Sequence, residues 1–126
     1  MSDLLKMTAT QAASSLLKKE ISSVELTNAY IDAMETTSAL NNYVTPTIEI
    51  AKKMAENSDK TFAAGSAGPL AGLPIGVKDL FCTKDTQTTA CSGILKGFTP
   101  TYESTVTSQI WQSGGVMLGK LNCDEF

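Results

Sequence analysis

The stretch Leu70-Ala-Gly-Leu-Pro-Ile-Gly-Val-Lys-Asp-Leu-Phe81 places one lysine inside an apolar run that glycine and proline interrupt. Residues 75–79 predict a short buried strand, because apolar and β-branched residues bounded by turn residues favour that state. An ammonium group is strongly hydrated and resists burial. Lys78 must therefore pair with a carboxylate, extend to water, or lose its proton and become a base. Its apolar neighbours are expected to be buried: Ile75, Val77 and Leu80.

The absence of histidine narrows the chemistry that this lysine can support. Hydrolases of the Ser-His-Asp or Cys-His kind use an imidazole as the base, and this chain has none. On local sequence alone, the simplest interpretation of Lys78 is a strand-end lysine that reaches solvent or pairs with a carboxylate such as Asp79. Asp79 is expected to be structural, as a turn or capping acceptor. Lys120, at the end of a second predicted strand, is expected to be exposed and without a role.

Length and composition bound the class of protein. With 126 residues, of which 42% are apolar, the chain has the size and apolar content of one globular domain. No run approaches the roughly 20 apolar residues that cross a bilayer. The first residues, 1–6, lack the charged and apolar regions of a secretory signal. We therefore expect a cytoplasmic protein, with an organellar location left open.

Charge and cysteine spacing argue against two further classes of function. The net charge is −3, and every basic residue is a lysine. Arginine, which suits bidentate recognition of phosphate, is absent, so direct binding of nucleic acid is not expected. Cys82, Cys91 and Cys123 have no C-x-x-C spacing, and without histidine they do not predict a zinc site. We expect free thiols, and neither metal nor cofactor in this chain.

Residues 1–63 are expected to form an N-terminal helical region without strands. Thr10 is a candidate N-cap for a helix over 11–19. Ser22-Ser-Val-Glu25 matches the capping-box pattern and predicts a second helix that extends to about Thr37.

A third helix and a change of composition complete the division of the chain. Pro46 suits the start of a helix over 47–63, where apolar residues recur at helical spacing. Small residues then indicate a flexible connector over 64–71. We expect residues 72–126 to begin an α/β domain, which the chain leaves incomplete.

The second half of the chain predicts two parallel strands. Residues 75–79 and 116–121 are the strands, and between them Ser104 is a candidate cap for a helix over 105–113. Residues 82–103 indicate irregular chain, with room for a short hairpin. Because a strand, crossover helix and strand give a parallel pair, we expect an α/β fold whose sheet needs further cover. The buried stripe of the crossover helix is expected to be Val106, Ile110 and Trp111.

Four blocks, in order, resemble the N-terminal part of the amidase signature family. Within that family, the second and fourth blocks are most similar to the glutamine-hydrolysing A subunits of aspartyl/glutamyl-tRNA amidotransferases. The resemblance covers the whole chain, which corresponds to about the first quarter of a typical member. Cys123 stands where these subunits commonly have methionine. The blocks are Gly72-Leu-Pro-Ile-Gly-Val-Lys-Asp79, Cys91-Ser-Gly-Ile-Leu95 with Gly97-Phe98, Glu103-Ser-Thr-Val106, and Gly119-Lys-Leu-Asn122 with Asp124-Glu-Phe126.

The resemblance implies a mixed sheet and a Ser–cis-Ser–Lys catalytic set, in which Lys78 matches the lysine. A desolvated, neutral lysine takes a proton from the bridging serine, which activates the nucleophilic serine for attack on an amide carbonyl. Both serines belong to a Gly/Ser-rich block that this chain does not contain. The chain alone is therefore expected to be inactive.

The same resemblance implies partners and a role in translation. The whole protein would hydrolyse glutamine and pass ammonia to a second subunit, which uses ATP and Mg²⁺ to convert Glu-tRNA(Gln) to Gln-tRNA(Gln). That second subunit would also hold the charged tRNA. The B and C subunits, of which C is the small one, would complete a heterotrimer. Two alternatives remain open. One is a general acyl-amide hydrolase of the same family, and the other is a non-catalytic gene remnant.

Overall fold

Strand β3 lies in the middle of a three-stranded mixed sheet in the computed structural model, which describes residues 3–126. The stretch searched for a secretory signal begins with two residues, Met1 and Ser2, that lie outside that range. The sheet order is β1-β3-β2, with β2 parallel and β1 antiparallel to β3. The main elements along the chain are α1 (Ala9–Leu17), α2 (Ser23–Thr36), β1 (Tyr43–Pro46), α3 (Ile48–Ala63), β2 (Pro74–Lys78), α4 (Thr105–Gln112) and β3 (Val116–Leu121).

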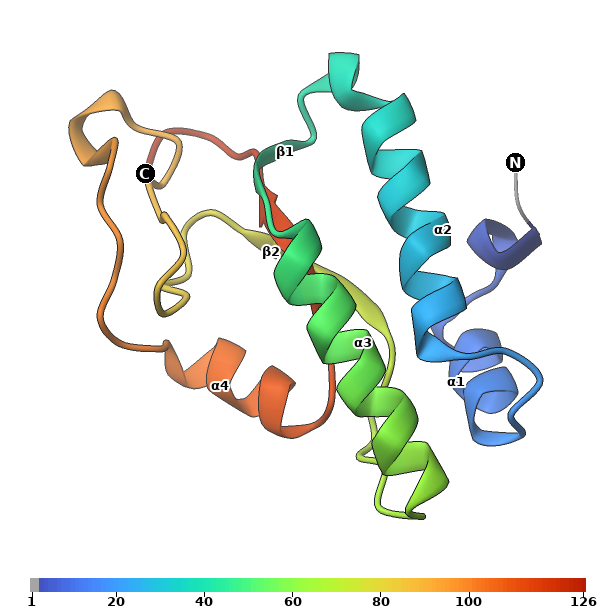
Figure 1. Ribbon diagram of the computed structural model, residues 1–126. Helices are drawn as coiled ribbons and strands as arrows, with labels where there is room; N and C mark the ends of the chain where they lie inside the picture. The colour runs from blue at the N-terminus through green and yellow to red at the C-terminus, as the bar shows by residue number, and fades with distance from the viewer. Residues whose placement is uncertain (1–2) are drawn as a thin grey trace.

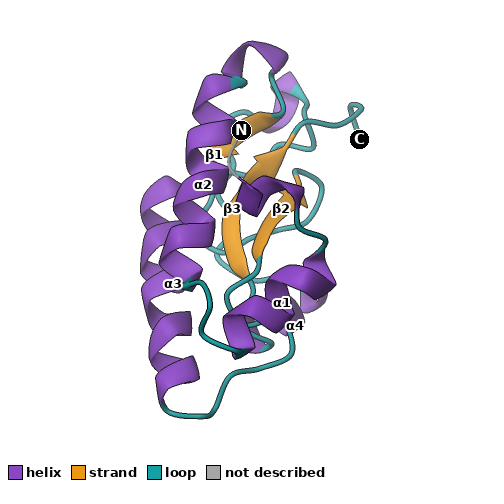
Figure 2. Cartoon of the chain, turned by 90° about the vertical axis from the view of Figure 1, so that its right-hand side faces the viewer, coloured by secondary structure: helices purple, strands orange, loops and turns teal. Residues whose placement is uncertain are grey.

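Helices α2 and α3 run side by side along one face of the sheet (Figures 1 and 2). They bury their apolar faces against β3, which is buried along its length except at its last residue. The main core therefore combines residues from both halves of the chain. Its buried members are Ile31, Met34, Ala51, Ala55, Val116 and Leu118. A smaller cluster under α1 contains Ala12, Leu16 and Leu26.

The predicted parallel pair and its crossover helix are confirmed. Strand β2 pairs with β3 from Pro74 opposite Val116 to Lys78 opposite Leu121. Ser104 caps α4 by accepting a hydrogen bond from the backbone of Thr107. The mixed sheet that the resemblance implied is present as well. The segment between β2 and α4 is irregular apart from a single 3₁₀ turn.

Strand β1 contradicts the expectation that residues 1–63 contain no strand. Three of its four residues pair antiparallel with the end of β3, with Tyr43 opposite Leu121 and an irregularity at Val44. Pro46, predicted to begin a helix, ends this strand instead, and α3 begins at Ile48. A proline without an N–H is tolerated there because β1 is an edge strand.

Two further expectations about helices were wrong in detail. Helix α1 begins at Ala9 and not at residue 11, because Thr8 rather than Thr10 forms its capping box with Gln11. In α4, Val106 of the predicted buried stripe is 48% exposed, and the buried residue is Thr107. The predicted capping box of α2 does form, between Ser22 and Glu25.

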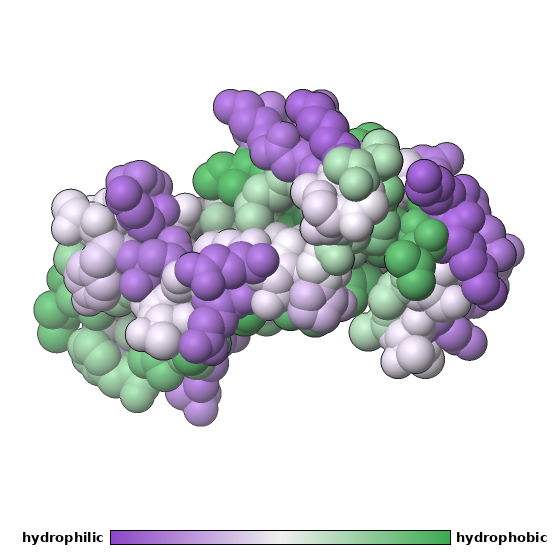
Figure 3. All heavy atoms as spheres, turned by 90° about the horizontal axis from the view of Figure 1, so that it is seen from below, coloured by the Kyte–Doolittle hydropathy of each residue, from purple (hydrophilic) through white to green (hydrophobic). Residues whose placement is uncertain are grey.

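Exposed apolar side chains occur as separate patches between hydrophilic ones on the face shown in Figure 3. Leu80 is one of the large exposed residues, at 47%, although the sequence predicted its burial. No helix in the described part of the chain is long and apolar enough to cross a membrane.

Asp59 on α3 holds the start of α2. Its two carboxylate oxygens accept hydrogen bonds from the backbone N–H groups of Ser23 at 2.7 Å and Val24 at 3.2 Å. These are two of the donors that a helix start leaves without an intrahelical partner. The carboxylate also carries the charge that the positive end of the helix dipole favours.

We predict that Asp59→Ala lowers the free energy of unfolding by about 1–2 kcal/mol, because both N–H groups lose their acceptor. Urea denaturation of the purified protein measures the change. Glu56→Ala removes an exposed carboxylate from the same helix and is the matched control. Equal stability of the two variants would show that Asp59 does not act as a cap.

Candidate active site

Lys78 is the last residue of β2, and its side chain is exposed. Its backbone carbonyl accepts a hydrogen bond from Phe81 at 3.1 Å, which begins a turn directly after the strand. Of the three alternatives that the sequence leaves for this lysine, the structure shows the one in which the ammonium reaches solvent. The apolar run around it is only partly buried, since Val77 is covered and Ile75 is half-buried.

Asp79 follows Lys78 and is fully buried. Its Oδ2 accepts hydrogen bonds from the backbone N–H of Thr89 at 3.0 Å and from the Thr89 hydroxyl. Its backbone N–H donates to the carbonyl of Leu121, and its carbonyl accepts from Ala90. The expected structural role of Asp79 as a turn acceptor agrees with these contacts. Asp79, which directly follows Lys78, is therefore fixed to β3 through its N–H and to the loop around residue 90 through its carbonyl.

Lys120 is buried, which contradicts the expectation that it is exposed. Its Nζ donates to the carbonyl of Phe81 at 2.8 Å and to the Thr88 hydroxyl at 2.9 Å, and it lies 3.4 Å from Oδ1 of Asp79. Burial lowers the pKa of Lys120, while the Asp79 carboxylate acts in the opposite direction. Its position on the central strand explains the burial, because β1 and β2 flank that strand and the loop after β2 covers the side chain.

Glu103 fixes the start of α4 to the same loop. Its carboxylate accepts hydrogen bonds from the backbone of Lys84 at 3.1 Å, from the indole of Trp111 at 3.2 Å and from the Thr107 hydroxyl. A half-buried carboxylate with three donors has a structural explanation. The indole contact also explains Trp111 as an anchor of its helix.

Lys78 differs from these neighbours, because its ammonium has no hydrogen-bond or ion-pair partner within residues 3–126. The carboxylate beside it pairs with Lys120 instead. Asp79, Glu103 and Lys120 form a polar framework that holds both strand ends and the loop between them. The sequence singled out Lys78 and Asp79, but it contained no signal for the burial of Lys120, which depends on strand order.

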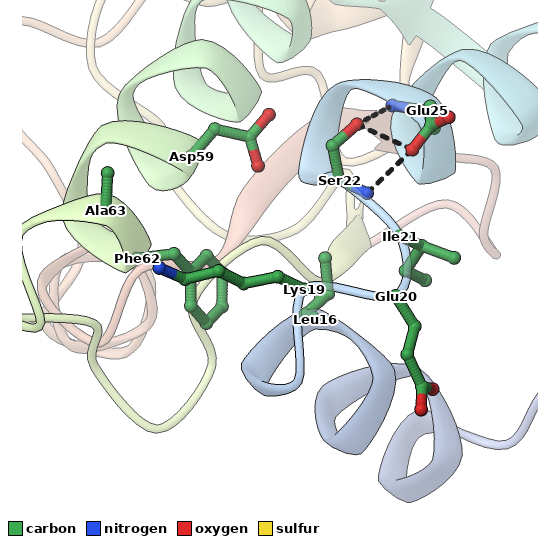
Figure 4. A pocket seen from close by; sticks show the side chains of 9 residues that line it. All are labelled: Leu16, Lys19, Glu20, Ile21, Ser22, Glu25, Asp59, Phe62 and Ala63. Carbon is green, nitrogen blue, oxygen red and sulfur yellow. Dashed lines mark hydrogen bonds between the residues drawn. The ribbon is translucent and has the colours of Figure 1, made fainter.

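A cavity of about 350 Å³ lies elsewhere, where the α1–α2 turn meets α3 (Figure 4). Ser22 and Glu25 bond each other at its edge, and Asp59 is bound to the start of α2. Its apolar wall comes from the small core cluster through Leu16 and Phe62. Ser22, Glu25 and Asp59 in this cavity are thus already explained by helix capping.

Comparison with known proteins identifies the family. The amidase family model matches residues 25–126, which include all four sequence blocks. The chain belongs to the amidase family. Lys78 and its framework therefore lie in an amidase domain, and the amidase resemblance of the sequence is confirmed.

Curated relatives in the amidase family match the whole chain. The A subunit of glutamyl-tRNA(Gln) amidotransferase from Parvibaculum lavamentivorans is 60% identical over 126 residues, and that from Bradyrhizobium sp. strain BTAi1 is 56% identical. Each match covers 100% of this chain and 26% of the relative. The chain thus spans about a quarter of the length of the relatives that it matches.

Solved amidases share the fold. The peptide amidase of Stenotrophomonas maltophilia superposes with a TM-score of 0.88 and 27% sequence identity, over 94% of this chain and 25% of that one. The short three-stranded sheet seen here is accordingly part of an amidase architecture, and the fold class that the sequence implied is confirmed.

Proposed function

We propose that this chain belongs to the glutamine-hydrolysing subunit of a tRNA-dependent amidotransferase, and that Lys78 is the general base of its Ser–cis-Ser–Lys set. Glutamine would be the amide donor, and the ammonia released would convert Glu-tRNA(Gln) to Gln-tRNA(Gln). The observation that carries this proposal is the 60% identity to the A subunit of an amidotransferase along all 126 residues. Identity to the peptide amidase is 27%, which favours the amidotransferase over a general acyl-amide hydrolase.

The geometry supports Lys78 as the base when the two strand-end lysines, Lys78 and Lys120, are compared. Lys120 is buried, and its three contacts to Phe81, Thr88 and Asp79 occupy it. Lys78 keeps its ammonium free while its peptide is held from both sides. A base needs such an anchored backbone with an amine that remains available for proton transfer.

The proposed chemistry also sets a requirement on the rest of the protein. A lysine accepts a proton only in its neutral form, whereas the Lys78 side chain here is exposed to water. Further residues of the whole protein must therefore cover Lys78 and favour its neutral form, as burial does for lysines. The same residues must supply the two serines and the oxyanion donors, since this chain lacks the Gly/Ser-rich block.

Partners and cofactors follow from the proposed function. The B and C subunits would complete the heterotrimer, and the B subunit would bind ATP, Mg²⁺ and the charged tRNA. This chain would contribute no metal or nucleotide ligand. Its lack of arginine agrees with a tRNA that is held elsewhere in the complex. A cytoplasmic location would suit this role.

A chimera tests the proposal. Residues 1–126 replace the corresponding segment of the P. lavamentivorans relative, and the product is assembled with that organism's B and C subunits. We expect the chimera to release ammonia from glutamine and to form Gln-tRNA(Gln). The isolated 126-residue chain should release none, because it lacks the nucleophile and the oxyanion donors. A folded but inactive chimera would contradict the proposal. Turnover by the isolated chain would contradict the expectation that the nucleophile and the oxyanion donors lie outside residues 1–126.

A further inference from the structure

Two cysteines that are far apart in the sequence lie in contact. The sulfur atoms of Cys91 and Cys123 are 3.2 Å apart, and the Cys123 thiol donates to the Cys91 sulfur. The backbone N–H of Cys123 donates to the same sulfur at 3.2 Å. Both residues are half-buried, and both are free thiols. Cys82 has a different partner, the hydroxyl of Tyr102, also at 3.2 Å.

Contacts on either side of the two sulfurs hold the pair together. The Ser92 hydroxyl donates to Glu125 at 2.7 Å, and the backbone N–H of Phe126 donates to the carbonyl of Ala90 at 3.1 Å. The loop over 89–92 and the segment over 122–126 are thus joined on both sides of the sulfur contact. The approach of the thiols is therefore built into the backbone, and it does not depend on that contact alone.

We propose that Cys91 and Cys123 form an oxidative modification site, a dithiol that takes a peroxide or a small disulfide as its co-reactant. With hydrogen peroxide, the O–O bond breaks, an S–S bond forms, and two protons and two electrons leave the thiols to give two molecules of water. The sulfurs must approach by about a further 1 Å to reach bonding distance. Small side-chain rotations cover such a movement, since the backbones are already side by side.

The pair also lies within the electrostatic reach of the candidate base. Burial and the hydrogen bond to Cys91 raise the pKa of the Cys123 thiol, and the Lys78 ammonium acts in the opposite direction. Ala90, which precedes Cys91, donates its N–H to the carbonyl of Asp79 at 2.8 Å. A bond that pulls on Cys91 therefore acts on Asp79, the residue that directly follows Lys78.

The first test counts thiols in the purified protein. Hydrogen peroxide or oxidised glutathione should reduce the free thiols from three to one per chain, with the loss of two hydrogens in the intact mass and without dimers. Peptide mapping should join Cys91 to Cys123, and a thiol reductant should restore all three thiols. Cys82→Ser should oxidise in the same way, whereas Cys91→Ser and Cys123→Ser should not. Bridges to Cys82, stable mixed disulfides with glutathione, or dimers as the main product would overturn the proposal.

The second test concerns the consequence for activity, and it rests on the proposed function. In the assembled chimera, oxidation should cause a loss of ammonia release that the reductant reverses, and Cys123→Ser should remain active after the same treatment. A chimera that is inactive when reduced would contradict the proposed function. It would not affect the conclusion from the thiol count, which does not depend on activity. A bridge that forms without a loss of ammonia release would refute the link to Lys78.

Discussion

Lys78→Met in the assembled chimera should reduce ammonia release from glutamine by at least about 100-fold, the range in which general bases contribute. Methionine keeps the unbranched apolar stem and removes only the amine that would accept the proton. Because the side chain is exposed and has no partner among residues 3–126, its removal should change the free energy of unfolding of the isolated 126-residue chain by less than about 0.5 kcal/mol. Steady-state ammonia release by the chimera and urea denaturation of the isolated chain measure the two effects.

Lys96→Met is the matched control for this loss. Lys96 is also exposed, and it follows the 3₁₀ turn of the loop rather than a strand of the site. Lys96→Met should leave ammonia release unchanged, because Lys96 lies outside the strands that carry Lys78 and Lys120. Near-normal turnover of Lys78→Met, or an equal loss in both variants, would remove Lys78 from the catalytic set.

Lys120→Met should lower the free energy of unfolding by about 3–5 kcal/mol, the range found when one member of a buried ion pair is removed. The change leaves the fully buried Asp79 carboxylate without its cation, and it leaves the Phe81 carbonyl without its donor. Small domains have total stabilities of about 5–15 kcal/mol, so a marginal protein would unfold. Urea denaturation or the shift in Tm measures the change.

A second variant separates the ion pair from the loss of packing. Lys120→Met combined with Asp79→Asn removes both charges, and the side-chain carbonyl of the new asparagine can still accept the hydrogen bonds from Thr89. The double variant should therefore be more stable than Lys120→Met alone. If the double variant is no more stable than Lys120→Met, the unpaired Asp79 charge is not the cause of the lost stability. Lys78→Met removes an exposed lysine from the neighbouring strand end, and its free energy of unfolding is the reference for Lys120→Met.

Helix starts were largely predictable because their signals are local. The Ser22–Glu25 capping box spans a single helical turn, and the structure forms it as the sequence indicates. The predicted start of α1 was wrong because Thr10 was taken as the N-cap. Thr8 is the N-cap instead, since Gln11 follows it by the three residues that a capping box requires. Asp59 could not be found in this way, since it reaches the α2 start from 36 residues away.

The two lysines show where sequence analysis fails. Each lies near the end of a strand, and the local pattern around Lys78 is the more apolar, so Lys78 was expected to face the choice between burial and water. The structure exposes Lys78 and buries Lys120. The reason is strand order: β3 is the central strand because β1 pairs with the edge of β3 that faces away from β2. The sequence did not predict β1, because it is only four residues long and ends in proline. Burial of a strand residue is a property of its neighbours, which a local pattern does not contain.

The central place of β3 also governs how this polypeptide can fold as it is made. Helices α2 and α3 bury their apolar faces against a strand that begins at Val116, 53 residues after α3 ends at Ala63. At the ordinary pace of roughly 5–20 residues per second, the ribosome needs several seconds to supply that strand. Throughout this interval Ile31, Met34 and their neighbours lack the central strand that covers them. The nascent chain therefore passes through a stage in which chaperones can bind it, and that stage ends only when Val116 and Leu118 emerge.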